Sequence, residues 1–199
     1  MREIKANQIK DKVKELFFKA NFYINPDLMQ RLKKALEEEN SPIGKYVLKM
    51  IIENNKIASR EEVPICQDTG LAILFIELGQ EVCIVDGDFV EAINQGVKEA
   101  YEEGYLRKSV VDDPVFERKN TKTNTPAIIY TDIVHKDKIK FTVMPKGFGS
   151  ENMSAIAMLK PADGAEGIIH FVVETVKKAD PNPCPPTIIG VGVGGTACR

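Results

Sequence analysis

Residues 66–70, with the sequence CQDTG, bring together several side chains that are suited to chemistry. They place a thiol, an amide, a carboxylate and a hydroxyl beside a glycine, directly before a short apolar run. Pro64 restricts the backbone just ahead of them. A plain turn would explain Asp-Thr-Gly, but it would need neither Cys66 nor Gln67. We therefore treat the segment as a candidate functional site and keep the plain turn as its alternative.

A second candidate segment is NPCPP, residues 182–186. Prolines on both sides hold Cys184 in an extended backbone that has few hydrogen-bond donors, which presents the side chain rigidly. Cysteines beside proline are common near iron–sulfur clusters. Cys66 and Cys184 cannot bind a cluster alone, however, because cluster binding usually takes three or four thiolates. A cysteine buried as a small apolar side chain is the alternative in each case.

Basic residues in polar loops suggest an anionic ligand. Arg107 and Lys108 follow a predicted helix, and Lys146 opens residues 146–152, KGFGSEN. Arginine binds carboxylates through paired hydrogen bonds, although a single surface arginine is usually only part of the solvated surface. Backbone N–H groups in the glycine-containing turn after Lys146 are suited to binding an anion.

Other sequence features indicate structure rather than chemistry. Cys83 lies in an apolar run and is predicted to belong to the core. No CxxC pair is present, so a structural zinc site is poorly supported. Residues 190–195 match G-x-G-x-x-G after a predicted strand. Neither the helix nor the acidic residue that a dinucleotide site requires follows in this chain, so we expect a turn or tight packing there.

Composition excludes several classes of protein. The 199 residues contain 27 Lys and Arg against 29 Asp and Glu, a net charge of −2, which argues against nucleic-acid binding. No apolar run approaches the roughly 20 residues of a membrane span, and the first residues do not resemble a signal peptide. Four cysteines are too few for a disulfide scaffold. We therefore expect a cytoplasmic protein that contacts neither membrane nor nucleic acid.

Apolar spacing predicts a mixed α/β (α+β) fold, in which a helical N-terminal region precedes a mixed sheet with packed helices. We expect one domain over residues 1–199, with a helical subregion at 1–62 and the site-bearing region at 63–199. Asn25-Pro26 and Ser41-Pro42 have the pattern of helix starts. The remaining predicted elements are a strand at 71–78 with a hairpin partner at 81–85, a helix at 88–104, a hairpin of 127–134 with 138–144, a helix at 165–178 and a strand at 187–193.

The CQDTG, KGFGSEN and NPCPP segments occur together and in this order in one known family. With them, residues 63–80, 104–134, 144–176 and 182–196 closely resemble the α subunit, or N-terminal catalytic domain, of class I iron–sulfur fumarate hydratases and L-tartrate dehydratases. The helical N-terminal region also has the family's character. The resemblance therefore covers essentially the whole chain.

The resemblance implies a [4Fe–4S] cluster held by three cysteines, of which Cys66 and Cys184 match two. The open iron would act as a Lewis acid on the substrate. Asp68 would be the acid that acts on the departing hydroxyl. Gln67 and Arg107 are similar to substrate-carboxylate contacts, and the backbone around Lys146 and Gly147 would be another.

The resemblance also implies a partner and a substrate class. A β subunit would supply the proton-abstracting base and further basic groups, in a homodimer or an α2β2 assembly. The substrate would be a C4 dicarboxylate: we expect hydration of fumarate to malate, with dehydration of L-tartrate to oxaloacetate as the alternative.

The sequence departs from the family pattern in three places. The family's third cysteine lies in a continuation beyond this chain, and Cys198 follows Cys184 too soon to match it. Phe148 and Asp180 stand where glycine is usual. The chain has the appearance of a C-terminally shortened α subunit, so we expect it to be inactive by itself. The remaining alternative is a fragment that folds and associates with a partner but holds no stable cluster.

Overall fold

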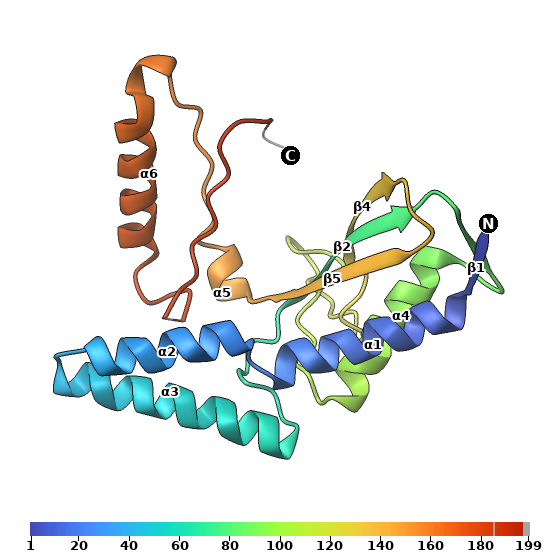
Figure 1. Ribbon diagram of the computed structural model, residues 1–199, viewed down its shortest axis with the longest axis horizontal. Coiled ribbons are helices and arrows are strands. Elements are labelled where there is room, and N and C mark those ends of the chain that lie inside the picture. Colours follow the sequence, from blue (N-terminus) through green and yellow to red (C-terminus); the bar gives the residue numbers. More distant parts are fainter. Residues whose placement is uncertain (185, 197–199) are drawn as a thin grey trace. The chain divides into compact units, whose positions relative to one another are not determined.

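The computed structural model describes residues 1–184 and 186–196 (Figure 1). Contacts within the chain divide it into two compact units, Met1–Lys146 and Gly147–Arg199, and each is described by itself. The mixed α/β class is confirmed. The expectation of a single domain over residues 1–199 stays a prediction.

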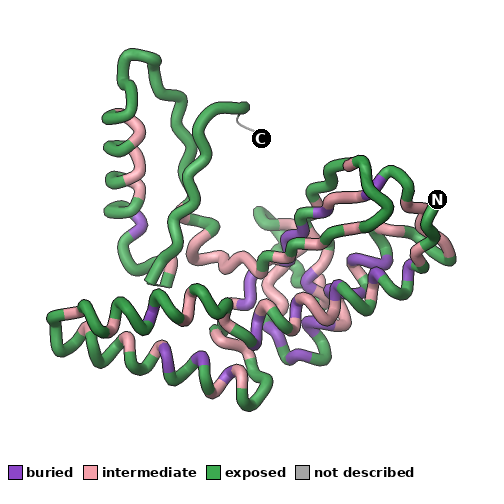
Figure 2. The backbone as a smooth tube through the Cα atoms, viewed as in Figure 1, coloured by how far each residue is buried: buried purple, intermediate pink, exposed green. Residues whose placement is uncertain are grey.

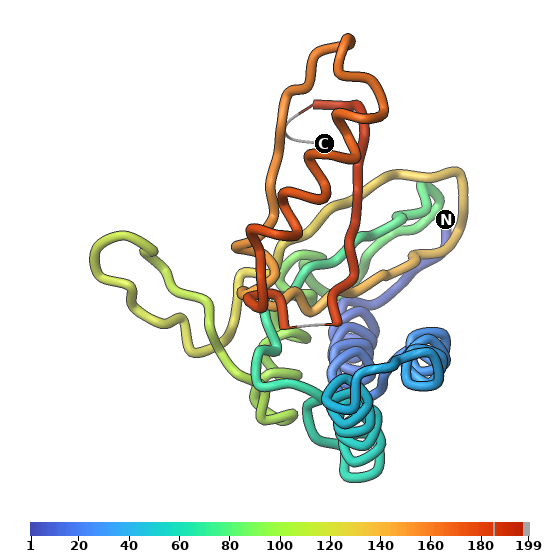
Figure 3. The backbone as a smooth tube through the Cα atoms, turned by 90° about the vertical axis from the view of Figure 1, so that its left-hand side faces the viewer, coloured from blue at the N-terminus to red at the C-terminus, as the bar shows by residue number. Residues whose placement is uncertain are grey.

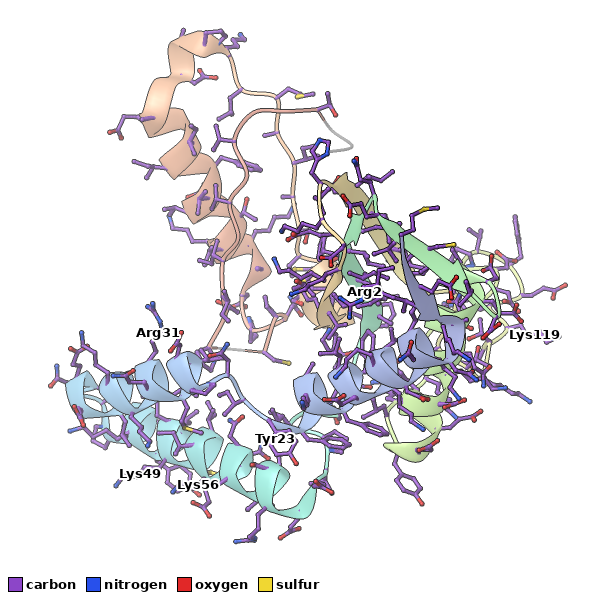
Figure 4. All side chains as sticks on the ribbon, turned by 45° about the vertical axis from the view of Figure 1, so that its right-hand side comes forward. Arg2, Tyr23, Arg31, Lys49, Lys56 and Lys119 are labelled. Atoms are coloured by element: carbon purple, nitrogen blue, oxygen red, sulfur yellow. The ribbon has the colours of Figure 1, made fainter. Side chains whose placement is uncertain are left out.

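The first unit begins with a short strand and three helices: β1 (Arg2–Lys5), α1 (Ala6–Phe22), α2 (Pro26–Glu38) and α3 (Pro42–Glu61). The two predicted helix starts are confirmed. The Asn25 side chain accepts the N–H of Asp27, and the Ser41 side chain accepts the N–H of Gly44. Helices α2 and α3 lie side by side, and Arg31, Lys49 and Lys56 point from them into solvent (Figure 4).

A three-stranded sheet forms the centre of the first unit. Strand β2 (Leu71–Gly79) lies between β4 (Ile128–Val134), which is parallel to it, and β5 (Ile139–Lys146), which is antiparallel. The predicted hairpin of 127–134 with 138–144 is therefore wrong, although both strands exist. Their connection passes over the end of β2 at Gly79, where a Cβ would lie 2.4 Å from the carbonyl oxygen of Lys136. A glycine is needed there for the two strands to reach opposite sides of β2.

The predicted pairing of β2 with residues 81–85 is also wrong. Strand β3 (Val82–Val85) pairs in parallel with β1, because both sides of β2 are already occupied by β4 and β5. Cys83 is half-buried in this two-stranded sheet rather than in the core. Helix α4 (Phe89–Glu103) follows and starts as predicted, with the Asp88 side chain accepting the N–H of Glu91.

The core lies where α1 and α4 cover one face of the three-stranded sheet. Figure 2 shows the buried positions along these two helices and β2. The largest fully buried side chains of the apolar core come from all three elements: Ile9, Val13, Phe17, Leu74, Ile93, Val97 and Tyr101. On the opposite face Phe75 stacks on Tyr130 with ring centroids 5.2 Å apart, and both rings are partly exposed.

The second unit contains α5 (Phe148–Glu151), the 3-10 helix η1 (Pro161–Asp163) and α6 (Gly164–Ala179). The predicted helix at 165–178 is confirmed. The strand predicted at 187–193 is wrong: these described residues pair with no other strand, and Ile188 and Val193 are exposed. A β-strand requires a neighbouring strand for its backbone hydrogen bonds, and alternating apolar residues do not supply one. Across the described residues, no helix is both long and apolar enough to span a membrane.

The crossing of α1 and α4 gives a stability prediction at Gly96. A Cβ there would lie 2.5 Å from the carbonyl oxygen of Lys10 and 3.0 Å from Cβ of Val13. Replacing a helical glycine by alanine ordinarily stabilises a helix by up to about 1 kcal/mol. We expect Gly96→Ala instead to lower the free energy of unfolding by about 1–3 kcal/mol, because the two helices must move apart. Urea denaturation followed by circular dichroism measures the change.

The control is Gln95→Ala on the exposed side of the same helix turn, which should change stability by less than about 0.5 kcal/mol. A Gly96→Ala variant as stable as the wild type would show that the close helix crossing is absent.

Candidate functional site

The CQDTG segment forms the connection between α3 and β2. Helix α3 ends at Glu62, which adopts a left-handed backbone with φ of 51°. Within the connection Cys66 and Gln67 are exposed, Asp68 is half-buried, and Thr69 and Gly70 are buried. The segment therefore presents its thiol and amide to solvent while its other end lies in the protein interior.

Two helices anchor the start of this connection through Ile65. Its N–H donates to the carbonyl oxygen of Asn21 at 2.9 Å, and its carbonyl accepts the side-chain amide of Asn54 at 2.8 Å. Asn21 is itself buried, and its amide donates to the carbonyl of Phe17. The residue before Cys66 is thus bonded on both its backbone groups to α1 and α3.

Helix α4 anchors the end of the connection through Tyr101. The fully buried Tyr101 hydroxyl lies 2.8 Å from the carbonyl oxygen of Thr69 and 3.0 Å from that of Gly70. Burial raises the pKa of this hydroxyl, and the negative charge of nearby Asp68 raises that pKa further. The hydroxyl therefore stays protonated and available as a donor.

Thr69 brings Arg107 to the same place. The Thr69 hydroxyl oxygen accepts the N–H of Arg107 at 2.9 Å and donates to the Arg107 carbonyl oxygen at 3.2 Å. The Arg107 side chain is exposed, and within the described part of the chain it forms no ion pair. The structure therefore joins the backbone of the predicted carboxylate binder Arg107 to Thr69, the residue that follows Gln67 and Asp68 in the CQDTG segment.

The sheet register brings Lys146 to the same edge. Leu71, the first residue of β2, pairs with Lys146, the last residue of β5. Half-buried Lys146 therefore lies level with the residue that directly follows CQDTG. The segments that carry four of the predicted site residues, Gln67, Asp68, Arg107 and Lys146, thus meet at one edge of the sheet.

A projecting loop, residues 105–127, connects α4 to β4 and contains Arg107. We call it the finger loop. It extends away from the sheet in Figure 3, and Lys119 marks it in Figure 4. Its turn is closed by Asp113, whose carboxylate accepts the backbone N–H groups of Val115, Phe116 and Glu117. These bonds hold the pKa of Asp113 below its usual range.

A shallow polar hollow of about 580 Å³ lies at the base of the finger loop. Asn94, Lys119, Thr121 and Lys122 contribute to its lining. Neither the CQDTG segment nor Arg107 contributes to it, so it is separate from the edge just described.

In the second unit, two of the motifs lie side by side. Gly147 is the N-cap residue directly before α5, and its carbonyl oxygen accepts the Ser150 hydroxyl at 2.9 Å. A Cβ at Gly149 would lie 2.5 Å from the carbonyl oxygen of Asn182. The KGFGSEN turn and the start of NPCPP are therefore in direct contact, and only glycine fits at the point where they meet.

The two predicted cluster ligands have suitable donor chemistry. Cys66 and Cys184 are both exposed free thiols, and the N–H of Asp68 donates to Sγ of Cys66 at 3.4 Å. Backbone N–H donation to sulfur favours a ligating thiolate. Among residues 1–184 and 186–196, however, no group of three or more His, Cys, Asp or Glu side chains could hold a metal ion. Of the three described thiols, only Cys66 and Cys184 are predicted ligands, so the described residues supply no complete site, and Cys198 lies outside them.

Comparison with known proteins gives the family. The sequence model described as fumarate hydratase (Fumerase) matches residues 10–199. This chain belongs to the fumarate hydratase family. A Methanocaldococcus jannaschii protein provisionally named L(+)-tartrate dehydratase subunit α is 46% identical over 96% of this chain. The L(+)-tartrate dehydratase subunit α of Escherichia coli K12 is 30% identical over 84% of it.

The family prediction made from the three motifs is confirmed. The chain spans 68% of the length of the M. jannaschii relative and 55% of the E. coli relative. The matched region contains all three motifs.

The sequence did not reveal the residues that hold the CQDTG segment and Arg107 in place. Tyr101 lies in the helix predicted at 88–104 but was given no role, and the Thr69 hydroxyl was counted in the CQDTG segment without a partner. Asn21, Asn54 and Asn124 were not singled out, and each is bonded to the backbone of a distant segment. The only available signal was the polar composition of the NTKTNTP run that contains Asn124.

The buried Tyr101 hydroxyl predicts a dependence of stability on alkaline pH. Because folding raises its pKa above the ordinary value of about 10, its contribution to stability is complete below pH 10. That contribution is lost as the pH rises above 10, because the unfolded chain then releases the proton first. We expect Tyr101→Phe to be less stable than the wild type by about 1–2 kcal/mol at pH 8 and to lose less stability above pH 10. Urea denaturation at pH 8 to 11 measures both effects.

Tyr105→Phe is the matched control, since Tyr105 is 91% exposed. It should follow the wild-type curve at every pH. Parallel curves for the wild type and Tyr101→Phe would contradict the buried position of this hydroxyl.

Proposed function

We propose that this chain is the α subunit of a hydro-lyase that interconverts a C4 hydroxy-dicarboxylate and its dehydrated product. The observation that supports this proposal most directly is the Thr69–Arg107 contact. It joins the segment that carries Gln67 and Asp68 to the backbone of Arg107, whose exposed guanidinium forms no ion pair within the described residues. A hydro-lyase needs this combination, since it must bind carboxylates and protonate a departing hydroxyl.

Each of these residues has a role in the proposed reaction. The Arg107 guanidinium donates paired hydrogen bonds to one substrate carboxylate, and the Gln67 amide adds a further donor. Asp68 delivers a proton to the hydroxyl, which leaves as water while the C–O bond breaks. A base on the partner subunit takes the proton from the adjacent carbon, and that electron pair forms the new C=C bond. Donors at the carboxylate stabilise the negative charge that develops as the C–H bond breaks.

The proposal includes a [4Fe–4S] cluster, with Cys66 and Cys184 as two of its ligands. When bound, it would supply a Lewis-acidic iron beside the leaving hydroxyl. The N–H of Asp68 that donates to Cys66 Sγ also fixes the distance between this thiol and the Asp68 backbone. The backbone N–H groups of the turn that begins at Gly147, with Lys146 beside it, are the proposed second anion contact.

The names of the relatives suggest which substrate this chain acts on. The relatives in M. jannaschii and E. coli both have names of L(+)-tartrate dehydratase α subunits, which favours L-tartrate. The description of the matching family model is fumarate hydratase, so fumarate is the second candidate substrate. Their names as α subunits support a β subunit as partner. A homodimer or an α2β2 assembly in the cytoplasm completes the proposal.

The test is to co-express the chain with a tartrate dehydratase β subunit, reconstitute the complex with iron and sulfide without oxygen, and assay L-tartrate and fumarate. Asp68→Asn should lower kcat by at least about 100-fold, because the proton donor is lost. Arg107→Ala should raise KM for either substrate by roughly tenfold or more, because a charged hydrogen bond is lost.

Asp137→Asn and Arg31→Ala, both at exposed sites away from this edge, are matched controls and should leave kcat and KM unchanged. A complex that contains iron and sulfide but converts no C4 hydroxy acid would exclude hydro-lyase activity. Failure to bind iron and sulfide at all would favour a fragment that only associates with a partner.

A further inference from the structure

We propose that Thr69 is a positioning residue: its hydroxyl sets the location of Arg107 relative to Asp68 and thereby sets the affinity for the substrate carboxylate. The inference rests on the proposed function, because it assigns a role within the same site. Thr69 itself is only 3% exposed and lies behind the exposed edge. It therefore acts on the substrate through Arg107 rather than by contact.

The single hydroxyl group of Thr69 satisfies both backbone hydrogen-bonding groups of Arg107. One oxygen serves both backbone groups of Arg107, accepting its N–H and donating to its C=O. In a β-sheet, two backbone groups of the neighbouring strand, a C=O and an N–H, would be needed to bond the N–H and C=O of one residue. The residue after Asp68 thus fixes the main chain of a residue that lies 38 positions away in the sequence.

Asn124 holds the flanking residues of both segments, which makes the Thr69 contact rigid. The Asn124 side-chain oxygen accepts the N–H groups of Ser109 at 2.8 Å and Val110 at 3.2 Å, and its amide donates to the carbonyl of Gly70 at 3.0 Å. Asn124 is fully buried. The two segments are therefore joined by two side chains, of which only Thr69 acts on Arg107 itself.

The Arg107 guanidinium has no described partner that could orient it, so its position depends on its main chain. Paired hydrogen bonds to a carboxylate require a fixed direction of approach. If the main chain of Arg107 moves, binding must first restore that direction, at a cost in conformational entropy. Loss of the Thr69 hydroxyl should thus weaken substrate binding much more than it slows the chemical step.

The test compares Thr69→Val, which has the same shape without the hydroxyl, with Thr69→Ser, which keeps it. In the assembled α and β complex, Thr69→Val should raise KM for the dicarboxylate about tenfold, with kcat changed less than about threefold. Thr69→Ser should restore the wild-type KM. A role in stability alone would not produce this separation of KM from kcat, provided that the melting temperatures show all variants to be folded.

A double-mutant cycle identifies the residue through which Thr69 acts. In an Arg107→Ala background, Thr69→Val should add no further increase in KM, because the group that it positions is already gone. An equal tenfold increase in that background would overturn the proposal. So would a Thr69→Val enzyme with the wild-type KM.

A readout without substrate separates this proposal from the proposed function. In the isolated chain, Thr69→Val should speed hydrogen exchange at the Arg107 amide about tenfold, and Thr69→Ser should not. If the wild-type complex shows no hydro-lyase activity while this exchange difference is found, the proposed function fails and the positioning contact stands. Unchanged exchange in Thr69→Val would overturn the contact itself. If Thr69→Val does not fold, Thr69→Ala replaces it in every measurement.

Discussion

The pairing of β2 on both of its sides is the constraint on which the rest of the first unit depends. Because β4 runs parallel to β2 and β5 runs antiparallel, the start of β2, the start of β4 and the end of β5 meet at one edge of the sheet. The CQDTG segment precedes β2, Asn124 shortly precedes β4, and Lys146 ends β5. A hairpin of β4 with β5 would also bring the start of β4 to the end of β5, but β2 lies between them and adds the CQDTG segment to this edge. The chemistry of this edge thus follows from strand order.

At this edge, buried side chains satisfy the backbone while exposed side chains are left for a ligand. Tyr101, Thr69 and Asn124 bond the main chain from the interior, where an unpaired polar group is costly. Cys66, Gln67 and Arg107 lie on the outer side of the same loops and are exposed. Loops without regular hydrogen bonding are usually mobile, but here side chains replace the missing backbone partners. The exposed groups therefore stand on a rigid support without belonging to a helix or strand.

Local signals in the sequence predicted the local structure well. Asn25, Ser41 and Asp88 each cap a helix as their positions indicated, and the apolar run at 71–78 is a strand. Partner choice was not predictable, because a strand pattern does not say which edge it joins. Gly79 permits the observed pairing because two backbones approach closely there, a feature with no signature beyond a glycine at a strand end. The motif residues could likewise be named from the sequence, but the contact of Thr69 with Arg107 depends on the tertiary fold. Residues 187–193 illustrate the same point: they have a strand pattern, but the described structure offers them no strand to pair with.

The roles proposed for the residues at this edge are compatible with both fumarate hydration and tartrate dehydration. Malate and tartrate share both carboxylates and one hydroxyl on the carbon beside a carboxylate, and they differ only at the neighbouring carbon. In the proposed function, Arg107 and Gln67 contact a carboxylate and Asp68 serves the departing hydroxyl, so all three meet groups that the two substrates have in common. Discrimination by a hydroxyl is strong only where a site makes a hydrogen bond to it, since the unpaired partner is then costly with the wrong substrate. In the proposed function, the groups that distinguish tartrate from malate must therefore be ones that hydrogen-bond the second hydroxyl of tartrate, which Arg107, Gln67 and Asp68 do not contact.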